Sequence, residues 1–220
     1  MNTEDHRASG FIGTIRHRTP RYVYHRTRQA LYERGHRGDP WLTPAAIRLL
    51  ESLLRPADRA VEFGSGRSTV WLAGRVAQLT SVEHDRDWYE TVSARLRERG
   101  LVNVTLILAP VDLSAELPDR SEYARSALAF ADESVDFALV DGVYRDYTVK
   151  FLLPKIKRGG LLVIDNVNWY LPSCSRAPNS RTPALGPNGQ IWAEVAQQLA
   201  QWRSVWTSSG VWDTAVFIKS

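Results

Sequence analysis

From residue 41 onward, short apolar segments alternate with helix-length segments. The apolar segments read as strands because turn residues bound each of them. We expect strands at Arg59–Phe63, Leu79–Glu83, Asn103–Ala109, Ser134–Gly142 and Leu161–Asp165, and helices at 44–56, 68–78, 87–100, 121–131, 147–157 and 190–201. The sequence Arg158-Gly159-Gly160 is expected to form the turn before the fifth strand. Parallel strands need crossovers of this length, so the series predicts a doubly wound α/β sheet.

The C-terminal segment departs from this alternation. Residues 204–210 and 211–219 read as two strands joined by a short Ser-Gly turn, which predicts a hairpin that places an antiparallel strand in the sheet. Between the fifth strand and the last helix, residues 171–190 are rich in Pro, Ser, Asn and Gly, as in a lid or binding loop. A length of 220 residues suits one such domain.

The excess of positive charge lies in the N-terminal 40 residues. Residues 1–40 hold eight arginines against four acidic residues, which accounts for the whole net charge of +4. We therefore divide the chain into a basic N-terminal extension, residues 1–40, and a neutral domain, residues 41–220. The extension is expected to form a lid, contribute to a homodimer contact or bind a partner.

The sequence also indicates a compartment. The single cysteine, Cys174, cannot form an internal disulfide, and no apolar run reaches the 18 residues that a membrane span needs. The N-terminus has no apolar stretch typical of a signal peptide. We expect a cytoplasmic protein with no membrane span.

Acidic and amide side chains stand at the ends of the predicted strands, where open α/β sheets bind ligands. The series consists of Glu62 with Gly64, Ser65 and Gly66 after the first strand, Glu83 at the end of the second, Asp112 after the third, Asp141 after the fourth, and Asp165 and Asn166 after the fifth. The glycines let the backbone approach a ligand closely, and Glu83 is placed to accept both hydroxyls of a ribose. Singly, each residue also fits a turn or a helix cap. Together they predict a ligand site.

The segments VEFGSGRS, SVEHD, FALVDG and LLVIDN, followed by the hairpin, resemble a class I S-adenosylmethionine-dependent methyltransferase. The resemblance covers about residues 41–220. It implies a seven-stranded Rossmann-like sheet with an antiparallel last strand, and S-adenosylmethionine as cofactor. The implied cofactor-binding residues are Glu62, Gly64, Ser65, Gly66, Ser68, Glu83, His84, Asp112 and Asp141. Of these, His84 would lie beside the adenine, and Asp112 would meet its exocyclic amine.

Within that superfamily the chain is similar to the catechol O-methyltransferase-like branch, in which Asp141, Asp165 and Asn166 would be Mg²⁺ ligands. Few carboxylates with room for water suit this ion. The branch has a catalytic lysine three residues after its first metal ligand, whereas this sequence has Tyr144, followed by Arg145. We expect Mg²⁺-assisted O-methylation of a small-molecule or sugar hydroxyl. Without the metal, Asp141 would be the base, and Tyr144 or Arg145 would orient the acceptor.

Other readings fit parts of the sequence. A metal-independent enzyme could methylate a carboxylate or a nucleic acid, and Arg and Tyr interleave in residues 16–34 as nucleic-acid contacts do. Enzymes that methylate base amino groups, however, carry an (Asp/Asn/Ser)-Pro-Pro-aromatic motif where residues 141–144 read Asp-Gly-Val-Tyr, so nucleic acid is the less favoured acceptor. A nicotinamide-dependent oxidoreductase would need a glycine in place of Thr69. A non-enzymatic interaction module would leave the strand-end acids unexplained.

The acceptor pocket is the least specified part. Aromatic residues are expected to flank its mouth, namely Trp41, Tyr144, Tyr147, Trp169 and Tyr170. Arg145, Arg176 and Arg181 are candidates to hold a carboxylate or phosphate of the acceptor.

Overall fold

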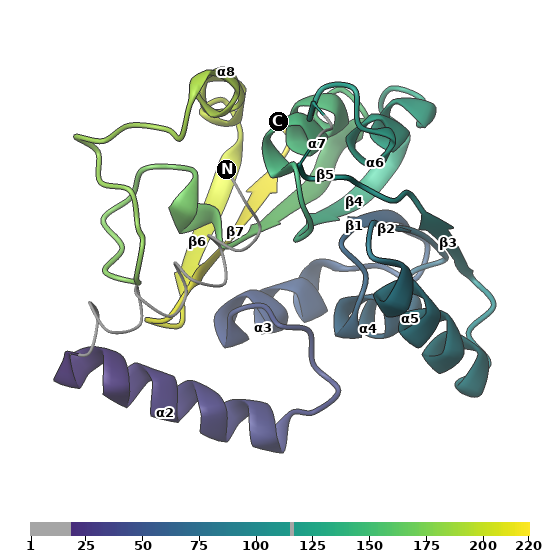
Figure 1. Ribbon diagram of the computed structural model, residues 1–220, viewed down its shortest axis with the longest axis horizontal. Coiled ribbons are helices and arrows are strands. Elements are labelled where there is room, and N and C mark those ends of the chain that lie inside the picture. The colour runs from purple at the N-terminus through teal and green to yellow at the C-terminus, as the bar shows by residue number, and fades with distance from the viewer. Residues whose placement is uncertain (1–18, 115–116) are drawn as a thin grey trace.

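The computed structural model describes residues 19–114 and 117–220, in which one seven-stranded sheet has the order β3-β2-β1-β4-β5-β7-β6 (Figure 1). Its strands are β1 (Arg59–Phe63), β2 (Gln78–Glu83), β3 (Val104–Leu108), β4 (Val135–Val140), β5 (Ile156–Asp165), β6 (Arg203–Ser208) and β7 (Asp213–Ile218). Strands β1 to β5 pair in parallel, and β7 is antiparallel to both β5 and β6. The predicted doubly wound fold with its C-terminal antiparallel hairpin is confirmed.

Helices cover both faces of the sheet. One face carries α3 (Pro44–Leu53), α4 (Arg67–Ala73) and α5 (Arg86–Glu98), and the other carries α6 (Glu122–Arg125), η1 (Ser126–Ala129), α7 (Arg145–Leu152) and α8 (Gln190–Leu199) (Figure 1). The short η2 (Val167–Trp169) follows β5. Side-chain caps set two of the starts: Thr43 accepts from the Ala46 amide, and Asp85 accepts from the Trp88 amide.

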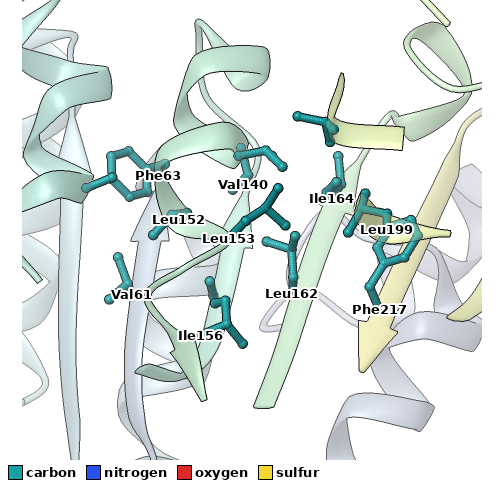
Figure 2. Close-up of a cluster of buried hydrophobic side chains, with 14 of the residues drawn as sticks. Val61, Phe63, Val140, Leu152, Leu153, Ile156, Leu162, Ile164, Leu199 and Phe217 are labelled. Carbon is teal, nitrogen blue, oxygen red and sulfur yellow. The ribbon is translucent and has the colours of Figure 1, made fainter. Parts of the chain in front are cut away.

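The core is divided between the two faces. Figure 2 shows the cluster beneath α7 and α8, where side chains such as Phe63, Leu152 and Ile164 are completely buried. The cluster on the opposite face includes Leu50 of α3 and Leu72 of α4. The central strands are buried on both sides, as expected where helices cover a parallel sheet. This rigid sheet fixes the loops that follow its strands.

One segment expected to form a turn is part of a strand instead. Arg158-Gly159-Gly160 falls inside β5 as a bulge, since β4 pairs Val135 with Ile156 and then Phe137 with Leu161. Gly159 supplies the positive φ of +75° that the bulge needs.

The N-terminal extension is described from residue 19; its residues 1–18 lie outside the described residues. It contains α2 (Pro20–Gly35), which packs Tyr32 against the α3 side of the core. Tyr32 also donates a hydrogen bond to Asp39. In the described part of the chain, no helix has the length and apolar character to cross a membrane.

Candidate active site

The site lies between β1 and β4, at the point where the order of the strands in the sheet reverses. The loops after these strands touch: a Cβ on Gly64 would lie 2.7 Å from the Gly142 nitrogen, and the Gly64 φ of +93° favours glycine. A Cβ on Gly142 would lie 1.8 Å from the hydroxyl of the buried Tyr123. At the topological switch point, Gly64 is therefore required by the close approach of the Gly142 backbone, and Gly142 by the close approach of the Tyr123 side chain.

A cleft of about 530 Å³ opens at this point. Its lining combines acids, aromatics and glycine backbone: Trp41, Gly64, Ser65, Glu83, His84, Asp85, Asp87, Trp88, Thr91, Asp141 and Gly142. Five of the predicted cofactor-binding residues are brought together here, namely Gly64, Ser65, Glu83, His84 and Asp141. The four carboxylates suit a cationic ligand and the two indoles suit a planar ring, so the lining fits S-adenosylmethionine, which carries both a sulfonium and an adenine.

Glu62 lies beneath the cleft rather than in its lining, and it is completely buried. Its Oε2 accepts hydrogen bonds of 2.6 Å from Thr69 Oγ1 and from Ser81 Oγ. Burial raises the pKa of Glu62 to about 7, against hydrogen bonds from Ser68, Ser81 and Thr69 that lower it. Thr69 also accepts from the Gly66 amide, so it ties the glycine loop to Glu62. Gly66 and Ser68, which were also predicted to bind the cofactor, interact with Thr69 and Glu62 and do not line the cleft.

Glu83 is anchored by its neighbours. Its Oε2 accepts from both the amide and the hydroxyl of Ser65 at 2.8 Å, and its Oε1 accepts from the amides of His84 and Asp85 at 2.9 Å. Burial alone would raise its pKa, but these bonds and nearby His84 hold the pKa below its ordinary value. A ribose hydroxyl would have to replace the Ser65 hydroxyl, and the predicted ribose contact stays a prediction.

Asp112 is exposed on the loop after β3, and its Oδ1 accepts from the amide of Ser114 at 2.9 Å and from its hydroxyl. It does not line the cleft described above. The adenine contact implied for it stays a prediction.

Arg145 joins the predicted metal ligands to one another. Its Nε donates to the Gly142 carbonyl at 2.8 Å, and its Nη2 donates to the carbonyl and the Oδ1 of Asp141 at 2.7 and 2.9 Å. Its Nη1 donates to the Asp165 carbonyl and, at 3.1 Å, to Asn166 Oδ1. All five N–H groups of the guanidinium therefore have partners. Only 9% of this side chain is exposed, so it forms a fixed buried cation.

The single positive charge of Arg145 can neutralise only one of the two carboxylates near it, those of Asp141 and Asp165. Burial raises the pKa of Asp141, while Arg145 beside it opposes the shift. Burial and the charge of Asp141 raise the pKa of Asp165 well above its ordinary value. Asp165 is almost completely buried and accepts from the hydroxyl of Thr214, the residue paired with it across β5 and β7. The cluster is neutral when Asp141 is ionised and Asp165 holds a proton.

The predicted magnesium site does not fit this arrangement. Asp141 Oδ1 and Asn166 Oδ1 both accept hydrogen bonds from Arg145, whereas Mg²⁺ demands its ligand oxygens at about 2.0–2.1 Å in octahedral geometry. A dication placed there would also be repelled by the guanidinium. Arg145 supplies the positive charge that the prediction assigned to the metal.

The other predicted catalytic and pocket residues are distributed differently. Tyr144 lies at the start of α7 with a left-handed φ of +45°, which turns the chain so that Arg145 points back to Asp141. Tyr170 stacks on Trp192 with ring centroids 4.9 Å apart and lies 5.7 Å from the Arg145 guanidinium. Of the five predicted aromatics, Trp41 lines the cleft, and the other four do not.

The two loop arginines have other positions. Arg181 donates to carbonyls of its own loop, at Gly186 and Leu185, and thus stabilises residues 171–190. Arg176 lines a separate small pocket together with residues of the N-terminal extension. The roles in acceptor binding suggested for them stay predictions.

Sequence reasoning missed two residues of the site, Trp88 and Thr214. Trp88 lines the cleft and donates from Nε1 to the Ser65 carbonyl, and its position just after the SVEHD segment was the available signal. Thr214 lies 49 residues from Asp165, so only the strand register could have brought it to the site.

Comparisons with known proteins agree on the fold and the domain. Residues 61–167 match the family model described as a methyltransferase domain. A comparison with curated proteins finds no match.

Three of the solved structures that are similar to this chain follow. Their sequence identities are low, so the similarity concerns the fold alone. A protein from Streptococcus mutans, solved in complex with S-adenosylhomocysteine, is 12% identical with a TM-score of 0.55, covering 83% of this chain and 99% of that one. A methyltransferase-like protein from Silicibacter pomeroyi is 21% identical with a TM-score of 0.55, covering 82% and 88%. An S-adenosylmethionine-dependent methyltransferase from Aquifex aeolicus is 14% identical with a TM-score of 0.51, covering 82% and 93%.

Proposed function

We propose that this chain, whose residues 61–167 match a methyltransferase domain within a seven-stranded α/β fold, transfers the methyl group of S-adenosylmethionine to a hydroxyl of a small molecule without a metal ion. The observation that carries this proposal is the position of Asp141, which lines the cleft and accepts a hydrogen bond from Arg145 at its Oδ1. When bound, the cofactor supplies an activated methyl group on a sulfonium. The chain must then provide alignment and a deprotonated acceptor.

Asp141 is suited to take the acceptor's proton. Its side chain is 29% exposed, and it lines the cleft beside Gly142. Burial raises its pKa, which makes it a stronger base than an exposed aspartate, and the Arg145 guanidinium beside it opposes this shift. A carboxylate acceptor has no proton to give and would be repelled by Asp141, so a hydroxyl fits better than methyl-ester formation.

Two predictions of the sequence change in this proposal. Arg145 supplies the positive charge that was expected from Mg²⁺. It also positions Asp141, the proposed base, rather than orienting the acceptor. Tyr144 keeps its proposed role in orienting the acceptor. Membership of the catechol O-methyltransferase-like branch stays a proposal that rests on the Asp141, Asp165 and Asn166 positions.

A screen of small-molecule hydroxyls, with release of S-adenosylhomocysteine as the readout, tests the proposal. We expect turnover that is unchanged in EDTA and that falls about 100-fold or more in Asp141→Asn. Turnover that stops in EDTA and returns with Mg²⁺ would refute the metal-free mechanism. Undiminished turnover in Asp141→Asn, with a carboxylate acceptor, would refute the base.

A further inference from the structure

A second pocket, of about 220 Å³, opens next to the cleft and is lined largely by arginine. Its lining residues are Arg37, Gly38, Arg67, Val70, Arg95 and Arg99. They come from three segments: the loop after α2, the start of α4, and the C-terminal end of α5 with the residue that follows it. Four arginines from parts of the chain that are distant in sequence therefore line one concavity.

These arginines have no carboxylate partners within the part of the chain that the structure describes. The ion pairs found there use other cations, such as Arg75, Lys150 and Lys157. Like charges held together without a counter-ion repel one another. An anion bound among them would remove this repulsion and accept hydrogen bonds from several guanidinium groups at once.

Two of the four arginines are held in place by the walls of the cofactor cleft. The Arg67 guanidinium lies 4.9 Å from the Trp41 ring centroid, and that of Arg95 lies 5.4 Å from the Trp88 ring centroid. Both indoles line the cleft. Stacking on an aromatic ring orients a guanidinium and lowers the entropy lost when it binds a ligand. The pocket is thus partly preorganised, and its arginines contact the indole side chains of the cleft wall.

We propose that this arginine pocket binds the phosphate or diphosphate group of a small phosphorylated molecule. Several guanidinium groups around one compact concavity match the oxygens of one such group, because guanidinium N–H pairs bind phosphate oxygens bidentately. A nucleic acid would instead use charges spaced along an extended surface to follow its backbone. The inference stands on the pocket and does not depend on the identity of the methyl acceptor.

Calorimetric titration of the full chain with pyrophosphate at low salt tests the proposal. The informative variant is Arg95→Ala/Arg99→Ala. Its matched control is Arg86→Ala/Arg97→Ala, which removes the same charge from the exposed surface of α5 outside the pocket. Inorganic phosphate and a single-stranded RNA oligonucleotide serve as further probes, and equilibrium urea unfolding reports that each variant is folded.

We expect one pyrophosphate per chain, with affinity about tenfold or more lower for each arginine removed from the pocket and nearly unchanged in the control. No pyrophosphate binding by the wild type, or an equal loss in the control, would overturn the proposal. RNA that binds much more tightly than pyrophosphate and loses affinity in both variants would assign the surface to nucleic acid instead.

Discussion

Replacing Arg145 tests whether a guanidinium holds the active-site carboxylates together. In Arg145→Ala, Asp141 loses its ion pair, and five acceptor contacts lose their donors. Removing one partner of a buried ion pair costs about 3–5 kcal/mol, so the free energy of unfolding should fall by that amount at neutral pH. Arg145→Lys keeps the charge but has three donors instead of five, and we expect a smaller loss of about 2 kcal/mol.

Equilibrium urea unfolding measures these losses, with Arg75→Ala as the control. Arg75 forms an exposed pair with Glu51, donates to the Trp71 carbonyl and lies over the Trp71 ring, and its removal should cost about 1–2 kcal/mol, less than that of Arg145. Arg145→Ala also frees oxygens of Asp141 and Asn166 for a divalent ion, so Mn²⁺ should stabilise this variant and not the wild type. A loss no larger than the control's, or equal stabilisation of both proteins by Mn²⁺, would refute the reasoning.

Three further predictions concern buried or cleft residues. Because the pKa of Glu62 is about 7 in the folded chain and 4.5 ordinarily, its stabilising contribution is complete below pH 4.5 and is lost as the pH rises through 7, a change of about 3 kcal/mol. In Glu62→Gln, urea unfolding between pH 4.5 and 7 should lack this fall, and an unchanged pH profile would contradict it. The Tyr123 hydroxyl is buried without a hydrogen-bond partner among the described residues, so Tyr123→Phe should raise the free energy of unfolding by about 1 kcal/mol; a loss would indicate a partner. In Trp88→Ala the affinity for S-adenosylhomocysteine should fall about tenfold by calorimetry, with partial retention in Trp88→Phe; equal affinity in all three proteins would remove Trp88 from the cofactor site.

The sheet and the position of the site could be predicted because both follow from local patterns. Strand length, helix length and the residue at each strand end are all readable along the chain, and parallel strands bring their carboxyl ends to one edge. Gly64, Glu83 and Asp141 were therefore correctly brought to one cleft.

The role of Arg145 could not be predicted in the same way. Its contacts depend on the left-handed conformation of Tyr144 and on the register that places Asp165 and Asn166 opposite it. The sequence marks the departure from a lysine, but it does not say that the arginine bends back onto the carboxylate. The arginine pocket has the same origin, since the packing of α4 against α5 brings Arg67 and Arg95 together and Arg37 joins them from the loop after α2.

The central claim is that the guanidinium of Arg145 stands at the site where the sequence predicted a magnesium ion. A crystal structure of the wild-type protein with S-adenosylhomocysteine, grown in millimolar Mn²⁺ and measured with anomalous scattering, tests it most directly. We expect Arg145 between Asp141 and Asn166, with no anomalous peak among Asp141, Asp165 and Asn166. A manganese peak coordinated by those three residues, with Arg145 turned away, would contradict the account.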